Sequence, residues 1–172
     1  AFGAPSEDEG EFYGLHGRIA YMPAEEYSVK TGMENGVCTA RLEGQIRQSK
    51  LFGEHLLLRR RYEFKHAINE IILEDEIVNE GFASCEYMQL YHFNFGYPFI
   101  DENAEIFLPT MEVRPRDEIS VPGRDNWTRM EAPADGAPEV CYFHTMRRDA
   151  DGASFASVYN HKLGLGMVYY YD

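Results

Sequence analysis

A short glycine-rich segment near the start of the sequence places a histidine and an arginine close together. In Gly14-Leu15-His16-Gly17-Arg18, glycines stand on both sides of the Leu15-His16 pair. Glycine allows the backbone to bend tightly, which would leave the imidazole of His16 and the guanidinium of Arg18 accessible to a ligand. The alternative is that His16 only stabilises a turn.

A second segment, residues 88–98, alternates polar and aromatic side chains around another histidine. In an extended chain, His92 and Asn94 would point to one face, and the aromatic side chains of residues 91, 93 and 95 to the other. Such a mixture suits a saccharide, whose C–H groups pack on rings while its hydroxyls form hydrogen bonds. A structural role in the core is the alternative for His92 as well.

Other classes of site have less support in the sequence. The six histidines form no pair at i, i+2 or i, i+4, so we expect no metal site, although ligands brought together from distant strands stay open. The sequence has no Gly-x-Ser-x-Gly motif and no glycine-rich phosphate loop, and we expect no cofactor. The three cysteines are predicted to be buried thiols.

Several charged side chains are weaker candidates for binding a substrate. Arg18 and Arg60 could form paired hydrogen bonds to neighbouring hydroxyls, and Glu25 and Glu54 are further polar candidates. Arg60 is notable because it interrupts an otherwise apolar strand face, and an ion pair with a nearby carboxylate is the alternative explanation. The single tryptophan, Trp127, either supports a sugar ring or fills space under a loop.

Alternation with period two predicts that most of the elements that position these residues are strands. Apart from a helical turn after Pro23, the pattern favours an antiparallel β-sandwich or barrel with a long loop region over residues 109–138. The predicted strands are residues 37–47, 56–65, 71–78, 85–94, 105–108, 111–116, 140–146, 154–160 and 166–171.

Length and charge restrict the class of protein. The 172 residues suffice for one domain or a large part of one, and we expect a single β-sandwich domain over residues 1–172. Sixteen basic against 29 acidic residues give a net charge of −13, which disfavours nucleic acid and anionic membranes as partners. No apolar run is long enough to span a membrane and no signal peptide is visible, which favours the cytoplasm.

Both ends of the sequence look cut. An apolar strand is predicted over the final residues, where a strand would normally continue to a partner. We therefore expect a fragment of a longer domain, and self-association through the exposed edge of this terminal strand as a hypothesis.

The sequence resembles the aldose 1-epimerases, or galactose mutarotases, through Leu15-His16-Gly17. The runs over residues 7–25, 52–54 and 90–98 are more similar still to the branch of galactose-mutarotase-like proteins filed as a domain of unknown function. The resemblance implies a β-sandwich of the mutarotase supersandwich type. It also implies a monosaccharide as the partner and isomerisation between the two anomers of a free aldose.

In such enzymes a histidine protonates the ring oxygen while a glutamate takes the proton from the anomeric hydroxyl. The ordinary pKa of histidine, near 6.5, suits this acid. By resemblance, His92 is the candidate acid and His16 a catalytic or substrate-binding residue. Arg18, Asn94, Glu25 and Arg60 are candidates for binding the sugar.

Two departures from the family pattern keep alternatives open. His92 lies two residues before Asn94, whereas four separate the acid from the asparagine in well-studied mutarotases. The resemblance also implies that the general base comes from a C-terminal segment beyond residue 172, so this fragment is expected to lack it. A carbohydrate-binding or regulatory module without catalysis, and a metal-dependent cupin-like barrel, are the alternatives.

Overall fold

A computed structural model describes residues 6–8 and 10–172 of the chain. The chain divides into two compact units, Ala1–Tyr91 and His92–Asp172, which are described separately below. Their secondary structure consists of β-strands and two 3-10 helices, so the predicted all-β class is confirmed. Among the described residues, no helix is long and apolar enough to cross a membrane. The single sandwich domain stays a prediction.

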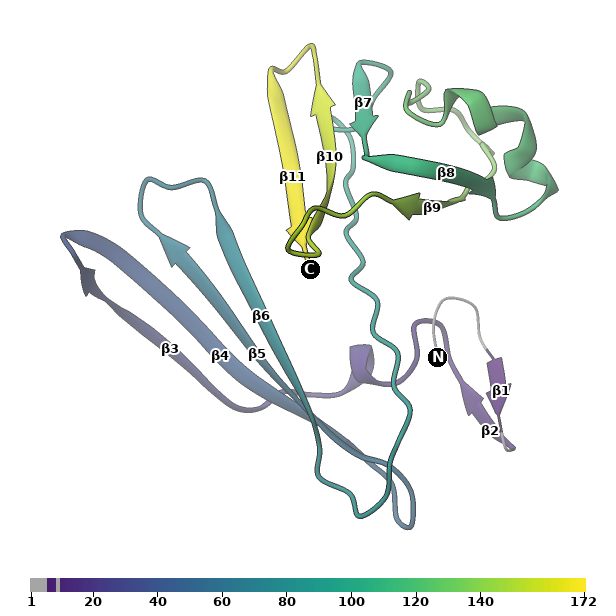
Figure 1. The fold of residues 1–172 in the computed structure, drawn as a ribbon. Helices are drawn as coiled ribbons and strands as arrows, with labels where there is room; N and C mark the ends of the chain where they lie inside the picture. The colour runs from purple at the N-terminus through teal and green to yellow at the C-terminus, as the bar shows by residue number, and fades with distance from the viewer. Residues whose placement is uncertain (1–5, 9) are drawn as a thin grey trace. The chain divides into compact units, whose positions relative to one another are not determined.

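The first unit contains a small hairpin and a larger antiparallel sheet (Figure 1). Strands β1 (Ser6–Asp8) and β2 (Glu11–Tyr13) form the hairpin, which is followed by the 3-10 helix η1 (Ile19–Tyr21). Neighbouring strands then pair in sequence order to form the four-stranded sheet: β3 (Glu25–Glu34), β4 (Val37–Ser49), β5 (His55–Lys65) and β6 (Ile71–Asn79).

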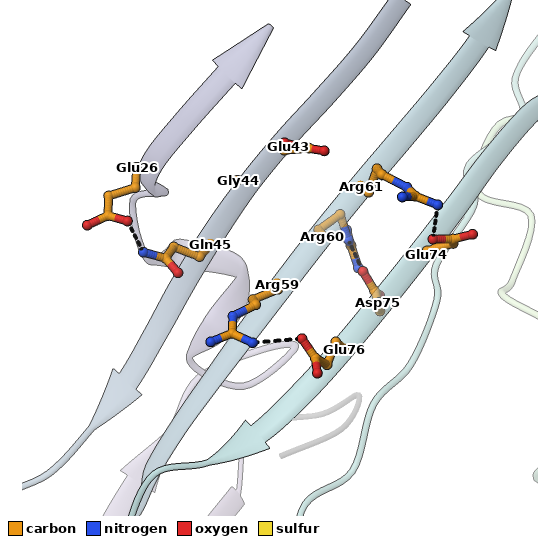
Figure 2. Close-up of a pocket in the computed structure, with 10 residues that line it drawn as sticks. All are labelled: Glu26, Glu43, Gly44, Gln45, Arg59, Arg60, Arg61, Glu74, Asp75 and Glu76. Carbon is orange, nitrogen blue, oxygen red and sulfur yellow. Dashed lines mark hydrogen bonds and ion pairs between the residues drawn. The ribbon is translucent and has the colours of Figure 1, made fainter. Parts of the chain in front are cut away.

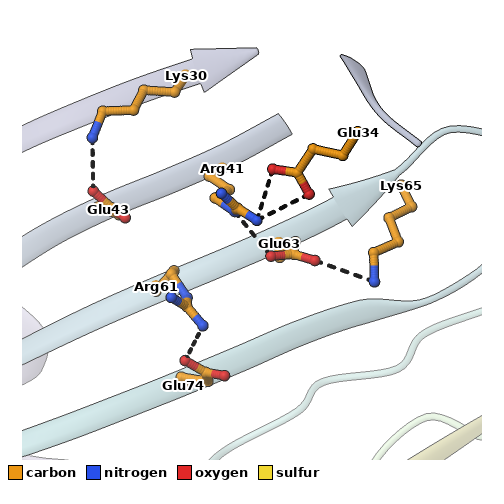
Figure 3. Close-up of polar contacts among 8 residues, drawn as sticks. All are labelled: Lys30, Glu34, Arg41, Glu43, Arg61, Glu63, Lys65 and Glu74. Carbon is orange, nitrogen blue, oxygen red and sulfur yellow. Dashed lines mark hydrogen bonds and ion pairs between the residues drawn. The ribbon is translucent and has the colours of Figure 1, made fainter. Parts of the chain in front are cut away.

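The register of the four-stranded sheet separates an apolar face from a charged face. On the apolar face, Leu58 of β5 pairs with Ile46 of β4 and Ile77 of β6, and the same alternation continues along each strand. On the charged face, Arg41 contacts Glu63 at 2.9 Å and Lys30 contacts Glu43 at 3.4 Å across neighbouring strands (Figure 3). Burial of the apolar face favours this register of the sheet, and so do the opposite charges that face one another across strands.

The second unit contains two smaller antiparallel sheets. Strand β10 (Ser154–Asn160) lies between β7 (Ala104–Phe107) and β11 (Leu165–Tyr171), while β8 (Thr110–Pro115) pairs with β9 (Tyr142–Met146). The 3-10 helix η2 (Glu118–Asn126) follows β8 and is capped by Asp117, whose side chain accepts a hydrogen bond from the amide of Ser120. Strand β11 forms one edge of its sheet within the described residues, and pairing of a second copy there stays a prediction.

Two sequence-based predictions of secondary structure are wrong. The helical turn expected after Pro23 is absent, because β3 begins at Glu25 and pairs with β4; the 3-10 turn comes earlier, before Pro23. The strand expected over residues 85–94 has no ladder partner within the described residues, so the alternating segment is extended but unpaired. The other predicted strands are confirmed, and each of their ends lies within two residues of the predicted position.

Candidate functional site

Arg60 lies on the apolar face of the four-stranded sheet and forms an ion pair with Asp75. The two residues are directly opposite one another on β5 and β6. The Nε and Nη2 atoms of Arg60 donate to the two carboxylate oxygens of Asp75, each at 2.7 Å (Figure 2). A guanidinium held by two parallel hydrogen bonds has a fixed orientation. The ion pair that was the alternative explanation for Arg60 is therefore present, and its binding of substrate stays a prediction.

Asp75 accepts more hydrogen bonds than this pair alone. Its Oδ2 atom also accepts from Gln89 Nε2 at 2.7 Å and from the hydroxyl of Tyr91 at 2.6 Å. The Asp75 side chain is only 4% exposed. Burial alone would raise the pKa of this carboxyl, but the hydrogen bonds from Arg60, Tyr91 and Gln89 outweigh it and lower the pKa below its ordinary value. Asp75 is therefore a buried carboxylate that stays ionised.

We call Arg60, Tyr62, Asp75, Gln89 and Tyr91 the Asp75 cluster. The Arg60 guanidinium lies 5.9 Å from the ring centroids of both Tyr62 and Tyr91, and it donates to the Tyr62 hydroxyl at 3.3 Å. Hydrogen bonds to Asp75 raise the pKa of Arg60 above its ordinary value, so the guanidinium stays charged. The cluster joins β5 and β6 to the extended segment that leads into residues 92–98.

A small apolar pocket adjoins Arg60 on the same face of the sheet. It has a volume of about 150 Å³ and is lined mainly by Tyr27, Leu42, Ile46, Arg60 and Tyr62, with Gly44 between them. Gly44 pairs with Arg60, and a Cβ atom at this position would lie 3.6 Å from the Cβ of Tyr27. The pocket thus combines two aromatic rings with one side of a fixed guanidinium.

The segment that carries His92 and Asn94 is attached to the second unit by its aromatic side chains. Phe93 packs on Tyr169 of β11 with ring centroids 4.6 Å apart, and Phe95 meets Phe99 edge-on at 5.7 Å. His92 and Asn94 are exposed. Phe93 and Phe95 are also exposed, at 43% and 42%, so the expected alternation does not separate a buried face of this unpaired segment from a surface face.

Asn160 fixes the far end of this segment. It is fully buried at the end of β10, where its Nδ2 donates to the carbonyl of Phe99 at 3.0 Å and to Asp101 Oδ1 at 2.8 Å. Its own oxygen accepts from the amide of Leu163 at 2.9 Å. These bonds hold residues 98–101, immediately after the cis peptide Tyr97–Pro98, against the sheet.

His16 and Arg18 lie in one tight turn of the first unit. His16 and Gly17 both have positive φ angles, 66° and 74°, and the amide of Gly17 donates to the carbonyl of Gly14 at 3.1 Å. This turn is the one that the two glycines predicted. His16 is exposed.

The guanidinium of Arg18 contacts two carboxylates. It forms ion pairs with Glu11 and, at 3.0 Å, with Glu54, and it lies 4.7 Å from the ring centroid of Tyr13. Burial raises the pKa of Glu54, but hydrogen bonds from its own backbone and from Gln48, together with the charge of Arg18, lower it overall. The structure therefore assigns Arg18 and Glu54, both binding candidates, to one ion-pair network.

Glu25 directly precedes Glu26, which lines a broad hollow over the four-stranded sheet, but Glu25 is not part of that lining. It lies at the start of β3 and contacts Arg47 at 3.6 Å. The hollow, about 500 Å³, is lined mostly by charged side chains that pair across strands, such as Arg59 with Glu76 at 2.9 Å (Figure 2). Pairs of this exposed kind fit a hydrated surface better than a binding site for a neutral sugar.

Trp127 packs against a histidine that the sequence did not single out as a candidate. The ring of His144 on β9 lies 4.5 Å from that of Trp127, edge to face, and its Nδ1 is 3.1 Å from the hydroxyl of Thr110. Burial lowers the pKa of His144. Trp127 is half-buried, which agrees with the alternative that it fills space beneath the loop region.

No group of three or more histidine, cysteine, aspartate or glutamate side chains within the described residues has a geometry that could hold a metal ion. The acidic side chains of the described sheet faces are instead used in ion pairs with arginine and lysine.

A family model described as Domain of unknown function (DUF4432) matches residues 1–172. The chain belongs to the DUF4432 family. The fold is also similar to the crystal structure of a putative aldose 1-epimerase from Klebsiella pneumoniae subsp. pneumoniae, with a TM-score of 0.94 and 23% sequence identity. No curated protein matches the sequence.

The match to the Klebsiella protein covers 99% of this DUF4432 chain and 44% of that protein, so the chain spans less than half of its length. The similarity shows an all-β fold of the aldose 1-epimerase type, as the resemblance implied. The structure brings His16 together with Arg18 in one turn, and His92 with Asn94 in one segment. By register, Glu25 lies opposite Gln45 and Arg60 opposite Gly44, so Glu25 and Arg60 belong to opposite faces of one sheet.

Asp75, Gln89 and Tyr91 were not selected as candidates from the sequence. A signal for Asp75 was present, because it follows Ile71 and Leu73 in alternation and so interrupts an apolar strand face in the same way as Arg60. Two opposite charges, each isolated on an apolar face of neighbouring strands, predict a pair. Gln89 and Tyr91 carry no such signal, since their contacts depend on the path of an unpaired segment.

Proposed function

We propose that the protein to which this chain belongs binds a monosaccharide and interconverts its anomers, as an aldose 1-epimerase. The observation that carries the proposal is the exposed pair His92 and Asn94, held on a segment whose aromatic side chains pack on β11 and the following loop. Exposed polar side chains on a segment supported by packed aromatic rings suit the hydroxyls and ring oxygen of a sugar. The family and the aldose 1-epimerase type of fold support this assignment.

In this proposal His92 is the acid that protonates the ring oxygen, and Asn94 binds a neighbouring hydroxyl. The ring opens, the C1–C2 bond rotates, and closure on the other face of the carbonyl gives the other anomer. The base that accepts the proton of the anomeric hydroxyl would be a carboxylate of the longer protein. An acid whose ordinary pKa is near neutrality needs little adjustment for this task.

His16, Arg18, Glu25 and Arg60 have different support as binding residues. His16 is exposed on a tight turn, and Arg60 borders the apolar pocket of about 150 Å³ beside two tyrosine rings. Arg18 and Glu25 already contact opposite charges, so a sugar hydroxyl would have to share or replace those contacts. Arg60 also contacts an opposite charge, Asp75, and its support as a binding residue is that it borders the apolar pocket.

The test is anomer exchange in the full-length protein, followed by NMR exchange spectroscopy on a panel of common aldoses and deoxy-aldoses. We expect exchange faster than in buffer for at least one sugar. His92→Ala should reduce the rate by about a hundredfold or more, in line with the usual contribution of a general acid. The control is His66→Ala, an exposed histidine in the turn between β5 and β6, which should retain the wild-type rate.

Saturable binding of a sugar with no acceleration of exchange in the full-length protein would reject catalysis. It would favour a carbohydrate-binding module instead. No binding and no exchange with any sugar of the panel would reject both functions.

A further inference from the structure

The residues on both sides of His92 make side-chain contacts that hold the chain. The residue before it, Tyr91, donates its hydroxyl to Asp75 Oδ2 at 2.6 Å, and two positions earlier Gln89 donates to the same oxygen at 2.7 Å. The residue after it, Phe93, packs on Tyr169 with ring centroids 4.6 Å apart. The backbone on either side of His92 therefore has a side-chain attachment, although no strand ladder holds it.

The contact that holds Tyr91 requires a buried charge, which is energetically unfavourable. The Asp75 carboxylate is 4% exposed on an apolar sheet face, and a charge there loses its hydration. Replacing such a buried ion pair with apolar side chains is often neutral or stabilising in proteins. Stability alone therefore does not account for a carboxylate at this position, whereas the need for a directional acceptor does.

The geometry of the acceptor is specific. Arg60 occupies both carboxylate oxygens from one side and so fixes the plane of the carboxylate, which leaves Oδ2 to accept from Gln89 and Tyr91. An apolar contact could hold the Tyr91 ring, but it would not set the position of its hydroxyl. The side chains of Gln89 and Tyr91 are consequently held at defined positions on the first unit.

We propose that Asp75, with Arg60, is a positioning residue that holds Gln89 and Tyr91 so that the chain reaches His92 with its imidazole correctly oriented for the sugar. This inference deepens the proposed function and rests on it. Asp75 does not contact the sugar in this scheme. It acts through the hydroxyl of Tyr91 and the peptide that joins Tyr91 to His92.

The experiment compares Tyr91→Phe with Tyr87→Phe in the full-length protein. Both substitutions remove one hydroxyl from the same extended segment, and Tyr87 is exposed and takes no part in the Asp75 cluster. For Tyr91→Phe we expect kcat for anomer exchange to fall about tenfold with KM changed less than twofold, because displacing a catalytic group affects the chemical step most. Tyr87→Phe should change neither constant.

A second readout does not depend on activity. Hydrogen exchange measured by mass spectrometry should show amides of residues 89–95 exchanging about tenfold faster in Tyr91→Phe, with β10 and β11 unchanged. The NMR signal of the His92 imidazole should also shift in Tyr91→Phe and not in Tyr87→Phe. A purely stabilising role would lower the melting temperature without a selective change in this segment.

The outcomes separate this inference from the proposed function. If no sugar exchanges but the selective changes at residues 89–95 and His92 appear, the proposed function fails while Asp75 still positions His92. If Tyr91→Phe leaves kcat, hydrogen exchange and the His92 signal as in Tyr87→Phe, the positioning role is overturned, whatever happens to the melting temperature.

Discussion

Substituting Asp75 by asparagine removes one charge from the apolar face of the four-stranded sheet with almost no change in volume. An asparagine keeps one oxygen that can accept from Tyr91 or Gln89. Its NH2 group is a donor, so it cannot accept the hydrogen bond that Arg60 gives to the second carboxylate oxygen of Asp75. Removing one partner of a buried ion pair costs about 3–5 kcal/mol. Because the Arg60 side chain is 32% exposed and water can partly hydrate it, we expect the lower end, about 3 kcal/mol.

The same carboxyl gives the prediction a pH dependence. The pKa of Asp75 is lowered in the folded protein, so the unfolded chain binds a proton on this side chain at a higher pH than the folded chain does. Its contribution to the free energy of unfolding is therefore complete above the ordinary aspartate pKa, near 4, and is lost as the pH falls through the lowered folded-state pKa. Asp75→Asn should lack this part of the acid dependence.

Urea unfolding of the full-length protein, followed by circular dichroism at pH 7 and at several values below 5, measures both effects. The matched control is Glu76→Gln, the next residue of β6, whose ion pair with Arg59 is on the charged face with side chains 64% and 53% exposed. This control should cost less than about 1 kcal/mol. A loss for Asp75→Asn no larger than that of Glu76→Gln at pH 7 would refute the reasoning about the buried pair.

Three further predictions concern packing and titration. Asn160→Ala should destabilise the second unit by about 2–4 kcal/mol, because the Phe99 carbonyl, the Asp101 carboxylate and the Leu163 amide each lose a hydrogen-bond partner. Thermal unfolding followed by Trp127 fluorescence measures this loss, and an unchanged midpoint would contradict it. Leu57→Ala should cost about 3 kcal/mol because Leu57 is 1% exposed, whereas Phe52→Ala, at a fully exposed position, should cost close to nothing in the same urea experiment; equal losses would contradict the burial argument. His144 should titrate in NMR below the ordinary histidine pKa, because burial disfavours its charged form. The unfolded chain therefore binds this proton more readily, and the free energy of unfolding decreases as the pH falls below about 6.5. A normal or raised pKa would show that the ring is hydrated.

The strands were largely predictable because their sequences alternate strictly. Residues 56–65 and 71–78 carry apolar side chains at alternate positions, interrupted only by Arg60 and Asp75, and a one-residue slip would turn this face to the charged side. Strand β3 was not predicted, although Tyr27, Val29 and Met33 share one face of it, and these side chains stay exposed in the structure. Its place depends on pairing with β4 rather than on its own pattern.

The candidate site was predictable in its parts and less so in its contacts. The glycines around His16 predicted a tight turn, and Arg60 was recognisable as a lone charge on an apolar face. The segment over residues 85–94 has the alternation of a strand but no ladder, because its side chains attach it instead: Tyr91 to Asp75, and Phe93 to Tyr169. Such attachments join residues 16 and 76 positions apart in the sequence, and no local pattern encodes them.

The central claim is that His92 serves a monosaccharide site, and NMR of histidine side chains in the full-length protein tests it directly. The protein would be labelled at its imidazole carbons and titrated with each sugar of the panel. We predict saturable shifts of the His92 signal with at least one sugar, while the signals of exposed His55 and His66 stay unchanged. A sugar that binds without moving the His92 signal, or that moves the His55 and His66 signals equally, would contradict the account.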